Sequence, residues 1–153
     1  MIDFRKIDVD QYDDEALLES DLVEPDARPP AQILADAKAK STEVRGLIQR
    51  GDAKGALAAV LADAPYGAQA ADATSTTLGA LLDILNSTKS SDIAGLVRNL
   101  SIDEQDTLMK YIYKGLGSPE LGASAVLLGW HEKLTEVAGT GCIVRVMTDH
   151  RRV

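Results

Sequence analysis

The sequence predicts an all-α protein, a compact α-α superhelix of about six to seven helices preceded by an extended acidic N-terminal arm. Aromatic residues make up only 4% of the 153 residues, so Leu, Val, Ile and Ala must fill the core, which favours packed helices over sheets. From residue 31 onward, apolar residues recur at three-and-four spacing. The length allows one domain, and we assign residues 1–30 to the arm and residues 31–153 to the helical body.

The first two helices are expected over residues 31–50 and 53–64. Gly51 is placed to end the first helix in a left-handed cap, and Asp52 is the expected N-cap of the Ala-rich second helix, which Pro65 stops. Because the connection is so short, the two helices should pack as a hairpin.

The next three helices are expected at residues 73–87, 91–100 and 101–117. Ser101 and Glu104 have the spacing of a capping box at the start of the fifth helix, and Gly115 and Gly117 should end it. An apolar pattern repeats weakly at a period of 37 residues, which predicts a stack of helical hairpins. The repeat pairs Val44, Leu47, Ile48, Ala56, Leu57 and Val60 with Leu81, Ile84, Leu85, Ile93, Ala94 and Val97.

The sixth helix should begin at Ser118-Pro119-Glu120, because these residues supply an N-cap, a proline at the first helical position and an acid in the first turn. It should continue to Gly139. The short apolar segment that follows, residues 143–147, fits a helix and a strand equally.

The formal net charge is −8, and −7 of it lies in residues 1–29. This excess of acids argues against binding to the phosphates of nucleic acid or to an anionic membrane. Two interpretations of the arm remain open. It is either a solubilising segment or a docking segment whose apolar residues Phe4, Ile7, Val9 and Tyr12 contact a partner while the acids set the register.

The motifs of common enzymes and metal sites are incomplete in this chain. His131-Glu132 lacks the second histidine of a zinc-protease helix, and the single cysteine, Cys142, forms no recognisable pair with a histidine. We therefore expect no enzyme activity, no cofactor and no metal. One cysteine, and no apolar stretch near the roughly 20 residues that span a bilayer, favour a cytosolic protein.

Four side chains of the body are candidates for partner binding. Trp130 is either core filler or an interface anchor, and its neighbours Leu127 and Leu134 favour the core. Lys110, Lys114 and Lys133 either line a charged contact surface or belong to the solvated face.

Four stretches carry a resemblance to a known family: FRKIDVDQYD at residues 4–13, LMKYIYKG at 108–115, SAVLLGWHEK at 124–133 and GCIVRV at 141–146. They closely resemble subunit five, the smallest subunit, of the actin-related protein 2/3 complex. Residues 16–100 resemble the family mainly in helical pattern, and the composition of residues 15–30 departs from it.

The resemblance implies a non-catalytic structural subunit of the assembly that nucleates branched actin filaments, in the cytoplasmic actin cytoskeleton at patches or the cell cortex. It implies that the body docks on the β-propeller subunit and subunit four, that the arm tethers the actin-related protein 2 subunit, and that ATP belongs to the actin-related subunits. The arm positions that match the family are Phe4, Arg5, Asp8, Asp10, Tyr12 and Asp13. The alternative is a free-standing helical adaptor that binds a peptide on its concave surface.

Overall fold

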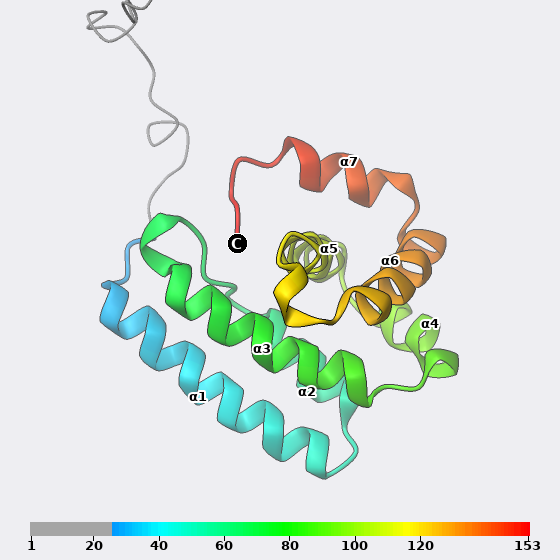
Figure 1. Ribbon diagram of the computed structural model, residues 1–153, viewed down its shortest axis with the longest axis horizontal. Coiled ribbons are helices and arrows are strands. Elements are labelled where there is room, and N and C mark those ends of the chain that lie inside the picture. Colours follow the sequence, from blue (N-terminus) through cyan, green and yellow to red (C-terminus); the bar gives the residue numbers. More distant parts are fainter. Residues whose placement is uncertain (1–25) are drawn as a thin grey trace, which may run out of the picture.

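The computed structural model describes residues 26–153, and this part of the chain is helical without a strand (Figure 1). The predicted all-α superhelix is confirmed. The helices are α1 (Pro30–Gln49), α2 (Ala53–Leu61), α3 (Ala71–Ser87), α4 (Ser90–Arg98), α5 (Ile102–Leu116), α6 (Ser124–Ala138) and α7 (Thr140–Thr148), with 3-10 turns η4 (Ala68–Ala70) and η5 (Pro119–Leu121). The last segment, which fitted a helix or a strand, is therefore a helix. No helix of the described residues is long and apolar enough to cross a bilayer.

The predicted capping residues shape the helix ends. Asp52 accepts a hydrogen bond from the backbone N–H of Gly55 at 2.8 Å, as an N-cap does. Ser101 and Glu104 form the complete capping box at the start of α5. Gly51 has a φ of +76°, the left-handed conformation expected after the end of α1.

The predicted start of the sixth helix at Ser118 is wrong. The proline and the acid there do begin a helical turn, but it is the short η5, and Gly122 ends it in a left-handed conformation with a φ of +65°. The helix proper, α6, begins at Ser124. The local start signal does begin a helical turn, but Gly122 interrupts the helix one turn later.

Helix α5 is the centre of the body, and Figure 1 shows it end-on with α6 and α7 beside it. Its buried residues are Leu108, Met109, Tyr111, Ile112 and Gly115. α1 packs along both α2 and α3, so the predicted first hairpin is confirmed. α4 packs mainly on α6, whereas the repeat of 37 residues predicted that it would fold back on α3. The repeated apolar positions are thus buried against different partners.

Gly115 allows α5 and α6 to approach closely. A Cβ atom at this position would lie 2.8 Å from Cδ1 of Leu127, closer than real Cβ contacts. Gly115 was expected to help end α5, but it lies inside the last turn, and the helix ends at Leu116 with Gly117 as its C-cap. Its role is to leave room for Leu127 of α6.

Candidate interaction surface

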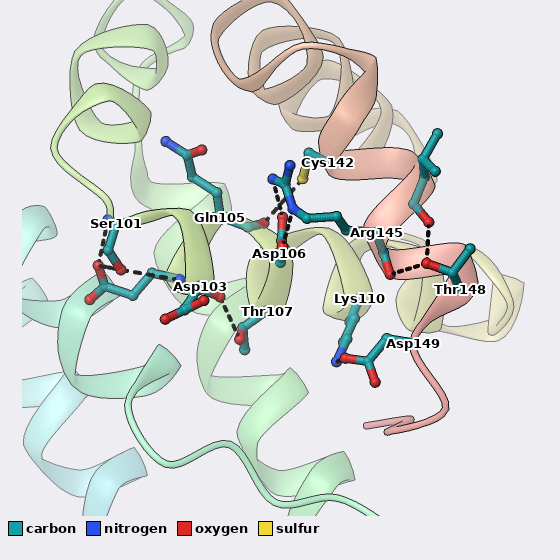
Figure 2. Close-up of polar contacts among 12 residues, drawn as sticks. Ser101, Asp103, Gln105, Asp106, Thr107, Lys110, Cys142, Arg145, Thr148 and Asp149 are labelled. Carbon is teal, nitrogen blue, oxygen red and sulfur yellow. Dashed lines mark hydrogen bonds and ion pairs between the residues drawn. The ribbon is translucent and has the colours of Figure 1, made fainter.

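Polar contacts at a constant spacing join α5 to α7 and to the segment that follows it. The Arg145 guanidinium donates two hydrogen bonds, of 2.6 and 2.8 Å, to the Asp106 carboxylate. Lys110 Nζ lies 2.6 Å from Asp149 Oδ2, one turn further along α5 (Figure 2). One more turn along, Lys114 Nζ donates to the carbonyl oxygen of Val153 at 3.1 Å.

The two partners in each contact are 39 residues apart, so the contacts follow one another in the same order along α5 and along residues 145–153. We call the three contacts the C-terminal ladder: Asp106 with Arg145, Lys110 with Asp149, and Lys114 with Val153. Cys142 is the buried residue of α7, while Val144 and Met147 are 59% and 74% exposed. Arg145 is the ladder residue that lies within α7, and Ile143 and Val146 of the same helix pack against the apolar core.

The ladder shifts the titration of its carboxyl groups. Burial acts to raise the pKa of Asp106, but hydrogen bonds from Arg145 and Cys142 and the nearby positive charges outweigh it and hold that pKa below its ordinary value. The same balance applies to Asp149, where burial is outweighed by Lys110 and by the backbone N–H of Arg151. Both carboxyl groups are consequently ionised at neutral pH.

The segment after α7 also contacts the loop between α2 and η4. The backbone N–H of Gly67 donates to the carbonyl oxygen of Arg152 at 3.1 Å. The guanidinium of Arg151 lies 6.0 Å from the centre of the Tyr66 ring, within the range of a cation–π contact. Residues 149–153 therefore bridge α5 and the α2–η4 loop.

This segment separates two hollows of opposite charge. The first, a cleft of about 710 Å³, is lined by Asp26, Asp63, Asp103, Glu104, Asp106 and Asp149 with only three cations, Arg28, Lys110 and Arg151. The second, a groove of about 430 Å³, is lined by Lys110, Lys114, Arg151 and Arg152 with one acid, Asp149, and by Tyr113, Val146, Met147 and Val153. We call them the acidic cleft and the basic groove.

The structure brings two of the four predicted body residues together. Lys110 and Lys114 both line the basic groove. Lys133 does not, and it lies on α6, where its Nζ is 2.9 Å from Glu136; the hydrogen bond and charge of Glu136 raise the pKa of Lys133. Trp130 is 1% exposed, and its Nε1 donates to the carbonyl oxygen of Leu85 at 3.4 Å. Trp130 thus fills the core, the favoured of its two interpretations.

The predicted arm positions lie outside the described residues. They are Phe4, Arg5, Asp8, Asp10, Tyr12 and Asp13. Their roles stay predictions.

Sequence reasoning missed Asp106, Arg145, Asp149 and Arg151. The signal was present as spacing: Asp106 and Lys110 are one turn apart, and so are Arg145 and Asp149, with the order of the charges reversed. Residues one helical turn apart share a face, so two such faces can pair where the helices pack together. Only the structure shows that α7 packs on α5.

Cys142 and His131 both have partners within the body. Burial is the main cause that raises the pKa of Cys142 to about 12, and its Sγ lies 3.7 Å from the carbonyl oxygen of Gln105. The ring of His131 lies edge-on to that of Tyr113, with Nε2 3.2 Å from the hydroxyl. Among residues 26–153, no group of three or more His, Cys, Asp or Glu side chains is arranged to hold a metal ion.

Comparison with known proteins covers the arm as well as the body. The chain matches the family model of the ARP2/3 complex 16 kDa subunit (p16-Arc) over residues 3–153. It is 39% identical over 150 residues to actin-related protein 2/3 complex subunit 5-C of Xenopus laevis, covering 98% of this chain and 94% of that protein. It is 34% identical over 154 residues to actin-related protein 2/3 complex subunit 5 of Saccharomyces cerevisiae, covering 99% of this chain and 98% of that protein.

Proposed function

Because the chain belongs to the family of the 16 kDa subunit, subunit five, of the actin-related protein 2/3 complex, we propose that it is a non-catalytic structural subunit of that complex. The observation that carries this proposal is the family match over residues 3–153, which includes the arm and every helix of the body. Membership implies a place in the cytoplasmic actin cytoskeleton, and we propose actin patches or the cell cortex as the sites.

Within the complex, we propose that the helical body docks on the β-propeller subunit and subunit four, while the N-terminal arm tethers the actin-related protein 2 subunit. The division of charge supports two separate contacts, because the body is nearly neutral and the arm carries −7. A segment joined to a docked body meets its second partner at a high effective concentration, which strengthens both contacts without a new interface. The complex would reach actin filaments through its other subunits.

The test of membership is native purification of the tagged full chain from its own cells, with mass spectrometry of the co-purifying proteins. We expect the chain to elute with six other proteins, two of them of the size of actin. Elution as a stable monomer, with no actin-related protein, would contradict membership and would favour the free-standing adaptor that binds a peptide on its concave surface.

The test of the arm is a complex containing a chain that lacks residues 1–14. We expect the body to stay with its own neighbours, while the actin-related protein 2 subunit is lost more readily during a high-salt wash. A double substitution at matching positions, Asp8→Asn with Asp10→Asn, should weaken retention in the same direction. Asp3→Asn, outside the matching set, is the control. Retention equal to that of the intact chain after deletion would overturn the tethering proposal.

A further inference from the structure

The acidic cleft and the basic groove are neighbours that share one wall. Lys110, Asp149, Arg151 and Val153 line both hollows. Among the ionisable side chains that line them, acids exceed bases by three in the cleft, whereas bases exceed acids by three in the groove. A charged segment that reaches this wall is therefore repelled on one side and attracted on the other.

The described chain begins in the acidic cleft. Asp26 lines the acidic cleft, where its carboxylate forms an ion pair of 2.7 Å with Arg28. The preceding segment, residues 13–24, reads DDEALLESDLVE and contains six acids and no base. It also contains apolar side chains that could fill a groove, namely Leu17, Leu18, Leu22 and Val23.

The charge of this segment opposes its entry into the acidic cleft and matches the basic groove. Lys114 and Arg151 are exposed at the groove, and Lys110 adds a third positive charge, which Asp149 partly offsets. Apolar surface is available beside these charges, because Met147 is 74% exposed. An acidic segment with apolar side chains thus finds both of the contacts that it needs.

The segment also starts close to the groove. It ends two residues before Asp26, which lines the cleft that shares a wall with the groove, and twelve residues in extended form span at most about 40 Å. Since the segment is covalently attached near this wall, its effective concentration at the groove is of the order of millimolar. An acidic segment on another molecule would need a much higher intrinsic affinity to compete.

We propose that residues 13–24 dock in the basic groove of their own body, with the acids facing Lys114 and Arg151 and the leucines against Tyr113, Val146 and Met147. The docked segment fixes where residues 1–12 leave the body, and so sets the direction in which they extend. This contact within one chain does not depend on the tethering proposed above.

The test uses the full chain carrying Ser20→Cys with a nitroxide spin label on the new cysteine. The backbone amides of the same chain are isotope-labelled, and their signals are observed by NMR. Cys142 is fully buried, so the introduced thiol is the one that reacts under mild labelling. We expect paramagnetic broadening of the amide signals of Lys114, Met147 and Arg151. Broadening confined to residues next to the label in sequence would overturn the proposal.

A charge reversal in the groove, Lys114→Glu with Arg151→Glu, should abolish the broadening. The matched control, Lys38→Glu with Arg98→Glu, reverses two exposed charges outside both hollows and should leave it unchanged. In the unsubstituted groove, raising the salt from about 0.1 M to about 1 M shortens the screening length from about 10 Å to about 3 Å and should weaken the broadening. Broadening that survives both changes would contradict charge-directed docking.

A mixture of spin-labelled chains and amide-labelled chains shows whether the segment in the groove belongs to the same chain or to a second copy. Docking within one chain predicts no broadening between molecules. Broadening of the same amides in the mixture would mean that a second copy supplies the segment, and would overturn the proposal.

Discussion

At the scale of single residues, Gly115 and Tyr111 show how the packing of α5 depends on individual atoms. Both are buried on the central helix. At Gly115 the missing side chain is required, because Leu127 occupies the space where a Cβ atom would lie. At Tyr111 the side-chain hydroxyl is unfavourable, because it is buried and no hydrogen bond to it is found among the described residues.

Gly115→Ala should destabilise the intact protein and stabilise the Leu127→Ala variant. In the intact protein, overpacking against Leu127 costs about 1 to 3 kcal/mol, which exceeds the gain in helix propensity of about 1 kcal/mol. Leu127→Ala alone should cost about 2 to 5 kcal/mol because it leaves a cavity, and the added methyl group then fills part of it. Urea unfolding of the intact protein, the two single variants and the double variant measures the change in free energy of unfolding that Gly115→Ala causes with and without Leu127. An equal effect of Gly115→Ala in both backgrounds would contradict the prediction.

Tyr111→Phe should leave the free energy of unfolding unchanged or raise it by about 1 kcal/mol. Burial raises the pKa of Tyr111, and the Thr77 hydroxyl, which donates to the carbonyl oxygen of Ala73 at 2.9 Å, lies near enough to lower that pKa in part. The Tyr111 hydroxyl forms no hydrogen bond of good geometry with it, so removing the hydroxyl removes a desolvation cost. Thermal unfolding monitored by circular dichroism checks this, and a marked loss of stability would mean that the hydroxyl has a partner.

At the scale of elements, α7 is held on the body by the C-terminal ladder, by the burial of Cys142 and by the packing of Ile143 and Val146 against the core. Asp106→Asn or Arg145→Gln should therefore increase the rate at which Cys142 reacts with an alkylating reagent. The thiol is buried and its pKa is raised to about 12, so its labelling at neutral pH reports the opening of α7. Asp106 helps to raise that pKa whereas Arg145 lowers it, so faster labelling in Arg145→Gln is the decisive result. Lys133→Gln breaks an ion pair on α6 outside the ladder and is the control. An unchanged labelling rate in both ladder variants would show that the ladder does not hold α7.

Acid should release α7. The pKa values of Asp106 and Asp149 lie below their ordinary value of 3.8, so their contribution to docking is complete above that pH and is lost as the pH falls through the lower values of the folded state. Amide chemical shifts of residues 140–153, followed from neutral pH to below 3.8, measure this release. In Asp106→Asn with Asp149→Asn, the acid-dependent part of the change should be absent.

Some helix ends could be predicted from the sequence, whereas others could not. Helix ends that depend on a side chain next to them, such as those capped by Asp52 and Ser101, could be predicted because the hydrogen bond is local. The start of α6 could not, because a signal at Ser118 was followed by an interrupting glycine, Gly122. The interaction surface was predicted only through Lys110 and Lys114, since its other members come from α7 and residues beyond it, and the packing of α7 on α5 is a tertiary property.

At the scale of the whole molecule, residues 149–153 join parts of the body that are distant in sequence. They contact α5 through Asp149 and Val153, and the α2–η4 loop through Arg151 and Arg152. Apolar burial holds the core on each side of this bridge. The bridge should therefore affect how the two sides open relative to each other more than it affects either side alone.

Removing residues 149–153 should increase amide hydrogen exchange both in the 62–67 loop and along the exposed face of α5, with little change in the buried residues of α1. Each lost hydrogen bond is worth about 0.5 to 1.5 kcal/mol, so global unfolding should shift modestly. His150→Ala, which removes an exposed side chain and keeps the backbone of the segment, is the control. Protection in both regions equal to that of the intact chain would contradict the bridging role.

The constant separation of 39 residues in the C-terminal ladder has a consequence for the way α7 attaches. Whichever of the three contacts forms first closes a loop of the same length, at nearly the same entropic cost. After the first contact, each remaining contact orders only the four residues between neighbouring contacts, so its further entropic cost is small. Attachment of the segment should therefore be all-or-none, with a single exchange process between bound and released states in place of progressive fraying from one end.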